Sequence, residues 1–172
     1  LTPEQKAVFN DWRGRIPAML QWLKTLSHPD GGIAFFNDAS FAVAPESNAL
    51  FNYALRLGIE PRLTTTKLTY LPVSGYARLE LGTAVALVDV APVGPDYLPA
   101  HAHADTLSFE MSLNKKRLIV NSGTSVYGIS AERHRQRGTA AHSTLFLANE
   151  NSSEVWGGFR VGRRAHVSEI LA

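Results

Sequence analysis

The 172-residue sequence contains no cysteine, which excludes disulfide bonds, thiolate metal sites and cysteine nucleophiles together. It also contains no apolar run of about 18 residues, the length that a membrane-spanning helix needs. No glycine loop has Walker or dinucleotide-binding spacing, and no Gly-x-Ser-x-Gly elbow is present. No motif of the sequence therefore supports nucleotide-dependent or α/β-hydrolase chemistry.

A strong excess of charge is absent as well. The sequence has 17 Lys and Arg against 15 Asp and Glu, a formal net charge of +2, and its basic residues are dispersed apart from a cluster at residues 133–137 and a pair at 163–164. A nucleic-acid surface would need many more phosphate contacts, so we expect no nucleic-acid partner. The hydrophobic fraction of 45% and the charged fraction of 19% are typical of a globular protein with a buried core.

The beginning of the sequence has neither an initial methionine nor the charged and apolar segments of a signal peptide. It starts at Leu1, inside a segment with helical periodicity. We therefore interpret the chain as a piece of a longer protein, in which a missing signal carries little meaning.

Helical periodicity covers the first third of the chain. The order Thr-Pro-Glu-Gln at residues 2–5 is that of a capping box, with proline at the first helical position. Apolar residues then recur every three or four positions, which predicts an amphipathic helix of about 24 residues that Pro17 bends or divides. A second helix is predicted over residues 45–61 and should stop at Gly58.

From Leu63 onward the period of the apolar residues changes from 3.6 to 2, which indicates β-strands. Gly82-Thr83 and Asn114-Lys115 each separate two such segments and predict tight hairpin turns. Around the second turn, apolar and polar residues alternate and predict a hairpin with one buried face. The predicted strands are 67–71, 76–81, 84–90, 106–113, 117–123, 143–148 and 159–170, and their polar, glycine-containing loops are typical of a sandwich.

Two histidines stand one residue apart just before one of these strands. In an extended segment His101 and His103 would point to the same face, about 7 Å apart at the backbone. Asp105 follows on that face, where it either orients an imidazole through its ring N–H or only ends the loop. Such a pair fits a metal or catalytic site, and it also fits histidines that simply hydrogen-bond within a loop.

A third histidine, His142, precedes another apolar segment, and Asn121 closes the hairpin that follows His103. If the strand ends converge, these three residues supply two imidazole nitrogens and one oxygen, a set suited to zinc with a fourth position open. A neutral amide oxygen is a weaker zinc ligand than a carboxylate. Loop histidines and a turn asparagine fit the same spacing.

Other polar residues have less specific surroundings. Arg137, five residues before His142, is a candidate to bind a substrate carboxylate or sulfate, with a solvated charge as the alternative. Tyr97 and Tyr127 flank the histidine segments and are candidates for proton transfer or sugar stacking, or else for half-buried packing. The remaining histidines are assigned to surface or loop positions: His28, His134 and His166.

The segments AHAHADTLSFEMSLNKKRLIVNSGTSVYG, RQRGTAAHSTLFL and SSEVWGGFRVGRRA follow one another between about residues 95 and 165. In this order the chain resembles the signature region of the heparinase II/III-like family of polysaccharide lyases. The resemblance implies an α+β multidomain fragment: residues 1–62 are the C-terminal helices of an α/α toroid, and residues 63–172 are the N-terminal part of an antiparallel β-sandwich.

The resemblance also implies β-elimination on a uronic-acid polysaccharide, such as a glycosaminoglycan or alginate. The uronate carboxylate is neutralised, a base removes the α-proton, and an acid assists the departing oxygen. By this resemblance His101 is catalytic, and His103, Asn121 and His142 hold a structural zinc ion, although better-known members carry Asp where this chain has Asn121. The family's catalytic tyrosine and a further histidine would lie upstream of Leu1, so we expect an active parent enzyme and an inactive isolated chain.

An acidic polysaccharide or oligosaccharide is the expected partner, and a homodimer is one assembly that this interpretation allows. Family substrates of this kind imply a periplasmic, cell-envelope or secreted location. A competing interpretation is a non-catalytic carbohydrate-binding or structural β-sandwich, which Asn121 favours slightly. A third, a self-contained metal-dependent hydrolase, requires an additional base that the sequence does not reveal.

Overall fold

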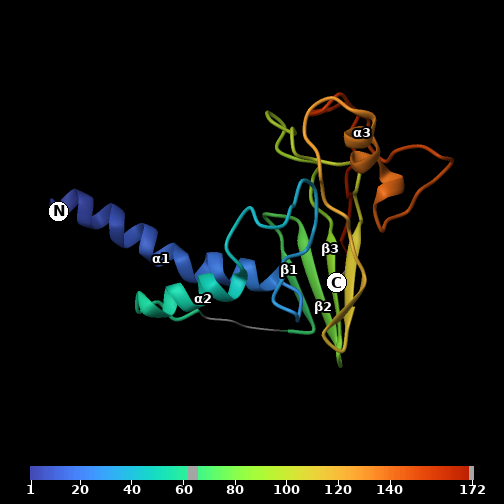
Figure 1. Cartoon of the computed structure of the whole chain (residues 1–172). Helices are drawn as coiled ribbons and strands as arrows, with labels where there is room; N and C mark the ends of the chain where they lie inside the picture. Colours follow the sequence, from blue (N-terminus) through green and yellow to red (C-terminus); the bar gives the residue numbers. More distant parts are fainter. Residues whose placement is uncertain (62–65, 171–172) are drawn as a thin grey trace.

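The computed structural model describes residues 1–61 and 66–170. Figure 1 shows two helices on one side of an antiparallel sheet, with a short third helix and several loops gathered at one end of the strands. The predicted boundary between residues 62 and 63 lies outside the described residues. Within them, no helix combines the length and the apolar character needed to cross a membrane.

The helices begin and end close to where the sequence predicts. Helix α1 (Pro3–Thr25) carries the expected capping box and continues through Pro17 as one helix. Helix α2 (Ser47–Arg56) ends just before Gly58, which adopts a φ of +66° that favours glycine. The two helices share a small apolar cluster, while much of the apolar surface of α1 remains exposed.

Five strands form a single meander in the order β1-β2-β3-β4-β5, and every neighbouring pair is antiparallel. Both predicted hairpin turns are confirmed: Leu81 pairs with Ala84 around Gly82-Thr83, and Leu113 pairs with Lys116 around Asn114-Lys115. The strands are β1 (Leu68–Leu71), β2 (Tyr76–Leu81), β3 (Ala84–Asp89), β4 (Phe109–Leu113) and β5 (Lys116–Ile119).

The last third of the chain is less regular than predicted. It contains α3 (Ala131–Arg137), a 3-10 helix (Thr139–Ala141) and a two-stranded sheet of β6 (Val155–Trp156) and β7 (Arg160–Val161). The predicted strand over 143–148 is wrong, and only two residues of the predicted strand over 159–170 are in a sheet. A strand needs a hydrogen-bonded neighbour, and among the described residues these two segments find only an isolated bridge and the short β6–β7 pairing.

The buried face of β4 is its polar face. Ser108, Glu110 and Ser112 are fully buried, whereas Leu113 on the opposite face is 38% exposed. The polar face of the sheet packs against the segment that follows α1, where an apolar cluster accompanies it: Leu26, Ala34, Phe36, Val85 and Leu87. The opposite, apolar face remains half exposed in the described part of the chain.

His28 explains how a polar sheet face can be buried. Its Nε2 lies 2.7 Å from Oε2 of Glu110, and its Nδ1 lies 2.7 Å from Oγ of Ser112. The other oxygen of Glu110 accepts the backbone N–H of Phe35. The expected surface or loop position of His28 is therefore corrected: it lies in a loop, but it is enclosed, because buried polar groups need such partners. This network ties the helical part to the sheet.

Candidate active site and metal centre

His101 and His103 lie in the irregular segment before β4 and share one partner, Asp38. Nδ1 of His101 lies 2.8 Å from Oδ2 of Asp38, and Nε2 of His103 lies 2.8 Å from Oδ1. The side chain of His101 is 69% exposed, whereas those of His103 and Asp38 are buried. One histidine is therefore open to a substrate, and the other is enclosed beneath it.

Asp38 is held by Arg133, and neither residue was predicted from the sequence to belong to the site. The fully buried guanidinium of Arg133 forms a two-pronged ion pair with both carboxylate oxygens of Asp38. It also donates to the carbonyl of Gly158, and its central carbon lies 5.2 and 5.4 Å from the ring centroids of Tyr127 and Phe159. A bidentate pair with these further contacts is geometrically fixed.

No local pattern around these two residues could have revealed the contact. Asp38 lies in a loop after α1, and Arg133 lies in a charged run that stands out in the sequence only as a basic cluster. The two are 95 residues apart in sequence. Only the fold brings them together.

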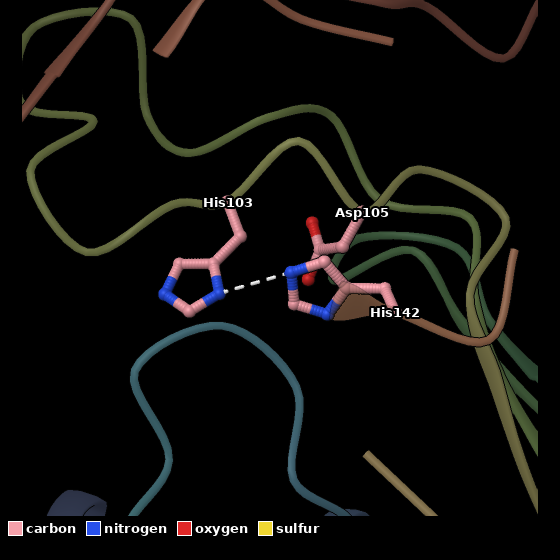
Figure 2. Close-up of side chains that lie close together, drawn as sticks. All are labelled: His103, Asp105 and His142. Carbon is pink, nitrogen blue, oxygen red and sulfur yellow. Dashed lines mark hydrogen bonds between the residues drawn. The ribbon is translucent and has the colours of Figure 1, made fainter. Parts of the chain in front are cut away.

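Figure 2 shows the second group of side chains, in which His103, Asp105 and His142 converge. Nδ1 of His103 lies 3.3 Å from Nε2 of His142, and one ligand atom from each of the three residues lies within 4.8 Å of the others. All three residues are buried or nearly so. Burial, followed by the neighbouring His103, lowers the pKa of His142 to about 3, so this ring is neutral, as a metal ligand must be.

Asn121 contacts the other side of His142. Its Oδ1 lies 3.0 Å from Nδ1 of that ring, and its buried Nδ2 has no hydrogen-bond partner. The structure therefore brings together all three predicted metal residues, His103, Asn121 and His142, and adds Asp105. Burial raises the pKa of Asp105, and burial together with the Asp105 charge raises the pKa of nearby Asp89 to about 8.

The positions of the ring protons of His103 and His142 indicate whether a cation fits between the two rings. Nε2 of His103 must carry the proton that Asp38 accepts, and Nδ1 of His142 must carry the proton that Asn121 accepts. The two remaining ring nitrogens then face each other at 3.3 Å with no proton between them. Turning the Asn121 amide by 180° would let Nδ2 donate to His142 and place a proton between the rings. The first arrangement suits a bound cation, and the second suits a metal-free pocket.

Distances agree with zinc. Tetrahedral coordination at about 2.0–2.1 Å places two nitrogen ligands about 3.3 Å apart, which is the separation of the two ring nitrogens. The carboxylate of Asp105 supplies a third, anionic donor, and Asn121 would act by orienting His142. The residues present therefore fit the ion.

Arg137 was predicted to bind substrate. Its side chain is buried, and its Nε and one terminal nitrogen donate to the carbonyl of Ala102 at 3.1 and 2.9 Å. Another of its contacts is the carbonyl of Arg160. Substrate binding by Arg137 stays a prediction that its placement does not favour, because the guanidinium holds backbone next to the histidines.

A cleft of about 650 Å³ opens beside His101. Tyr76, Asp89 and Asp105 line it on the sheet side, and the proline-rich segment 91–99 forms its other wall. Tyr127 and Phe159 stack with their centroids 6.1 Å apart, each edge-on to the imidazole of His101. An exposed imidazole that lines a cleft and contacts an aromatic pair is suited to a ring-shaped, hydroxylated ligand.

Gly123 fixes the loop that carries Asp38. Its φ is +60°, and a Cβ atom there would lie 2.3 Å from the carbonyl oxygen of Ala39. We expect Gly123→Ala to destabilise the protein by more than about 1 kcal/mol, because it adds strain and a clash at the same position. Urea unfolding measures this. Gly14→Ala, in α1 with no heavy atom near the added methyl, should be neutral or stabilising, and equal losses in both variants would contradict the prediction.

With this geometry established, comparisons identify the family. A family model described as heparinase II/III-like, C-terminal, matches residues 63–170. The chain belongs to the heparinase II/III-like family. The family match covers the sheet and both metal-site histidines but begins after Asp38.

Solved structures of heparinases share the heparinase II/III-like fold of this chain. A heparinase III, the BT4657 gene product, is 24% identical over 86% of this chain and 27% of its own, with a TM-score of 0.61. A heparan sulfate lyase, HepC from Pedobacter heparinus, is 23% identical over 78% of this chain and 24% of its own, with a TM-score of 0.63. A third structure, titled heparinase III, is 17% identical over 85% of this chain and 29% of its own, with a TM-score of 0.66.

The present chain spans only about a quarter of the length of these heparinases. At this identity the likeness concerns the fold: an α+β chain with an antiparallel sheet, as in the C-terminal part of heparinases. No curated protein sequence matches the chain.

Proposed function

We propose that the chain is part of a polysaccharide lyase that cleaves a uronic-acid-containing polysaccharide, a glycosaminoglycan or alginate, by β-elimination. The observation that carries the proposal is His101, an exposed imidazole whose Nδ1 is bound by a buried carboxylate and whose Nε2 is left free at the edge of a cleft. Family membership and the heparinase neighbours support the same chemistry.

In this reaction His101 would act as the base. Its Nε2 accepts the proton from the carbon next to the uronate carboxylate, the glycosidic C–O bond breaks, and a carbon–carbon double bond forms in the sugar. The imidazolium that results is stabilised by Asp38, which already lies 2.8 Å from Nδ1. Among the described residues no group is assigned as the acid for the departing oxygen, in agreement with an incomplete site.

The metal would have a structural role. His103, His142 and Asp105 would hold a zinc ion beneath His101, and Asn121 would orient His142. When bound, the ion supplies fixed positive charge and cross-links the segment before β4 to the segment after α3. His103 would then be held on both ring nitrogens, because Asp38 already contacts its Nε2 and its Nδ1 faces His142.

The exposed apolar surfaces support the proposed domain organisation. The half-exposed apolar face of the five-stranded sheet is suited to a second sheet, which would complete an antiparallel sandwich from residue 63 onward. The apolar groove between α1 and α2 is likewise suited to neighbouring helices of an α/α toroid that ends near residue 62. Both partners would belong to other parts of a longer protein.

The parent would encounter its acidic polysaccharide or oligosaccharide in the periplasm, at the cell envelope or outside the cell.

A second candidate function is a carbohydrate-binding module without catalysis. The stacked pair Tyr127 and Phe159 favours it specifically, because partly exposed aromatic rings can bind sugar faces without any base. The two candidates differ in whether His101 matters for turnover or only for binding.

The test compares the parent protein with the isolated chain on heparan sulfate and alginate, following the absorbance of unsaturated uronides. We expect the parent to be active, the isolated chain to be inactive, and His101→Ala in the parent to lower kcat by about 100-fold or more. His166→Ala is the matched control, since His166 is exposed and outside the site. A parent that binds these polysaccharides but never cleaves them would favour the binding module.

A further inference from the structure

We propose that Asp38 is a positioning residue that holds His101 and His103 in opposite tautomers, and thereby gives the two rings different functions. The inference rests on the proposed function for what the two rings do afterwards. The tautomers themselves are properties of the folded chain and can be measured without any substrate.

The geometry behind the proposal is a single carboxylate between two rings. Its Oδ2 contacts Nδ1 of His101, whereas its Oδ1 contacts Nε2 of His103, each at 2.8 Å. A carboxylate that is ionised only accepts hydrogen bonds, so the contacting nitrogen of each ring must carry the proton. His101 is therefore the Nδ1–H tautomer, and His103 is the Nε2–H tautomer.

Each tautomer leaves a lone pair in a different place. In His101 the lone pair is on Nε2, which the Asp38 contact leaves free on a side chain that is largely exposed. In His103 it is on Nδ1, which faces His142 in the buried group of potential ligands. Reversing either tautomer would turn a proton acceptor at the cleft into a donor, or a metal ligand into an N–H that repels the metal.

Asp38 can keep this role because Arg133 stabilises its negative charge. Arg133 is fully buried, binds both oxygens of Asp38 and has the carbonyl of Gly158 and the hydroxyl of Thr124 as further partners. A fully buried guanidinium that binds both oxygens of Asp38 favours its ionised form. The carboxylate therefore stays an acceptor for both rings.

The spacing of the histidines now has a structural reason. Residues at i and i+2 place two rings close enough to reach one carboxylate, while the different nitrogens that they present set them apart in function. Asp38, outside the family-matched segment, is what makes the His-x-His pair asymmetric.

The experiment records long-range ¹H–¹⁵N spectra of the histidine rings in the intact 172-residue chain, with signals assigned by their loss in His101→Gln and His103→Gln. We expect His101 to carry its proton on Nδ1 and His103 on Nε2, each favoured at least about tenfold by a charge-assisted hydrogen bond. In Asp38→Asn the amide has one acceptor oxygen in place of two, so at least one ring should switch its tautomer.

Asp30→Asn is the matched control, because Asp30 lies on the same loop, pairs with Arg117 and contacts neither ring. It should leave both tautomers unchanged. A wild-type spectrum with His101 protonated on Nε2 overturns the proposal even if Asp38→Asn does not fold, and so does a folded Asp38→Asn variant with both tautomers retained. An inactive parent enzyme with the expected spectra would refute only the lyase assignment.

Discussion

Arg133→Ala is expected to lower the free energy of unfolding by about 3–5 kcal/mol, because it leaves the buried carboxylate of Asp38 without its counter-charge. For a domain of this size, that corresponds to a fall in melting temperature of about 6–20 °C. The variant also removes the guanidinium that lies against the rings of Tyr127 and Phe159, so both rings lose a cation–π partner. Urea unfolding followed by tryptophan fluorescence measures the loss.

Arg135→Ala provides the comparison within the same helix. Arg135 is 63% exposed and pairs with Glu132 at the surface, an arrangement worth at most about 1 kcal/mol. The difference between the two variants therefore isolates burial of the ion pair from helix propensity and net charge. If Arg133→Ala were no more destabilising than Arg135→Ala, the Asp38 contact could not have the organising role assigned to it.

Zinc is expected to bind the wild-type chain and to stabilise it by about 2.7 kcal/mol at a free concentration one hundred times its Kd. His142→Ala should abolish this effect, because it removes one of the two imidazole ligands. Asp105→Asn should weaken binding strongly, since it removes the only negative charge in the ligand group. Calorimetric titration and the zinc-dependent shift in melting temperature measure both.

Variants of Asn121 distinguish between two models of the zinc site. If Asn121 only orients His142, Asn121→Ala should weaken zinc binding by about 10-fold to 100-fold and Asn121→Asp should retain it. If Asn121 is itself a ligand, Asn121→Ala should be as damaging as His142→Ala. His134→Ala, an exposed histidine on α3, is the neutral control. Absence of zinc from both the wild type and Asn121→Asp would eliminate the metal site altogether.

Local signals predicted much of the fold. The capping box at residues 2–5, the stop at Gly58 and both hairpin turns are set by neighbours in sequence, and the structure confirms each of them. Alternation along β4 identified which residues share a face but not which face is buried. Which face is buried depends on the contact between His28 and Glu110, which are 82 residues apart in sequence. This contact supplies the polar face with the hydrogen-bond partners that it needs in the interior.

Only part of the candidate site could be predicted from the sequence, for the same reason. The two histidine-containing motifs are local, and their convergence could be anticipated from the ends of predicted strands. Asp38 and Arg133 occur in a loop and in a charged run, where an unpaired surface role is the ordinary expectation. Their contact joins a loop to helix α3 across 95 residues of sequence, and no local pattern predicts such a pairing.

The ties between the helical part and the sheet have a consequence for evolution and engineering. Glu110 is bound by His28, Arg133 by Asp38 and Arg117 by Asp30, and each of these pairs joins the two halves of the chain. A chain cut at residue 63, where the family match begins, would keep both metal-site histidines and lose Asp38, the acceptor that His101 and His103 share. The two parts are consequently not interchangeable modules. Grafting this sheet onto another helical array would transfer His101 and His103 without the carboxylate proposed to set their tautomers.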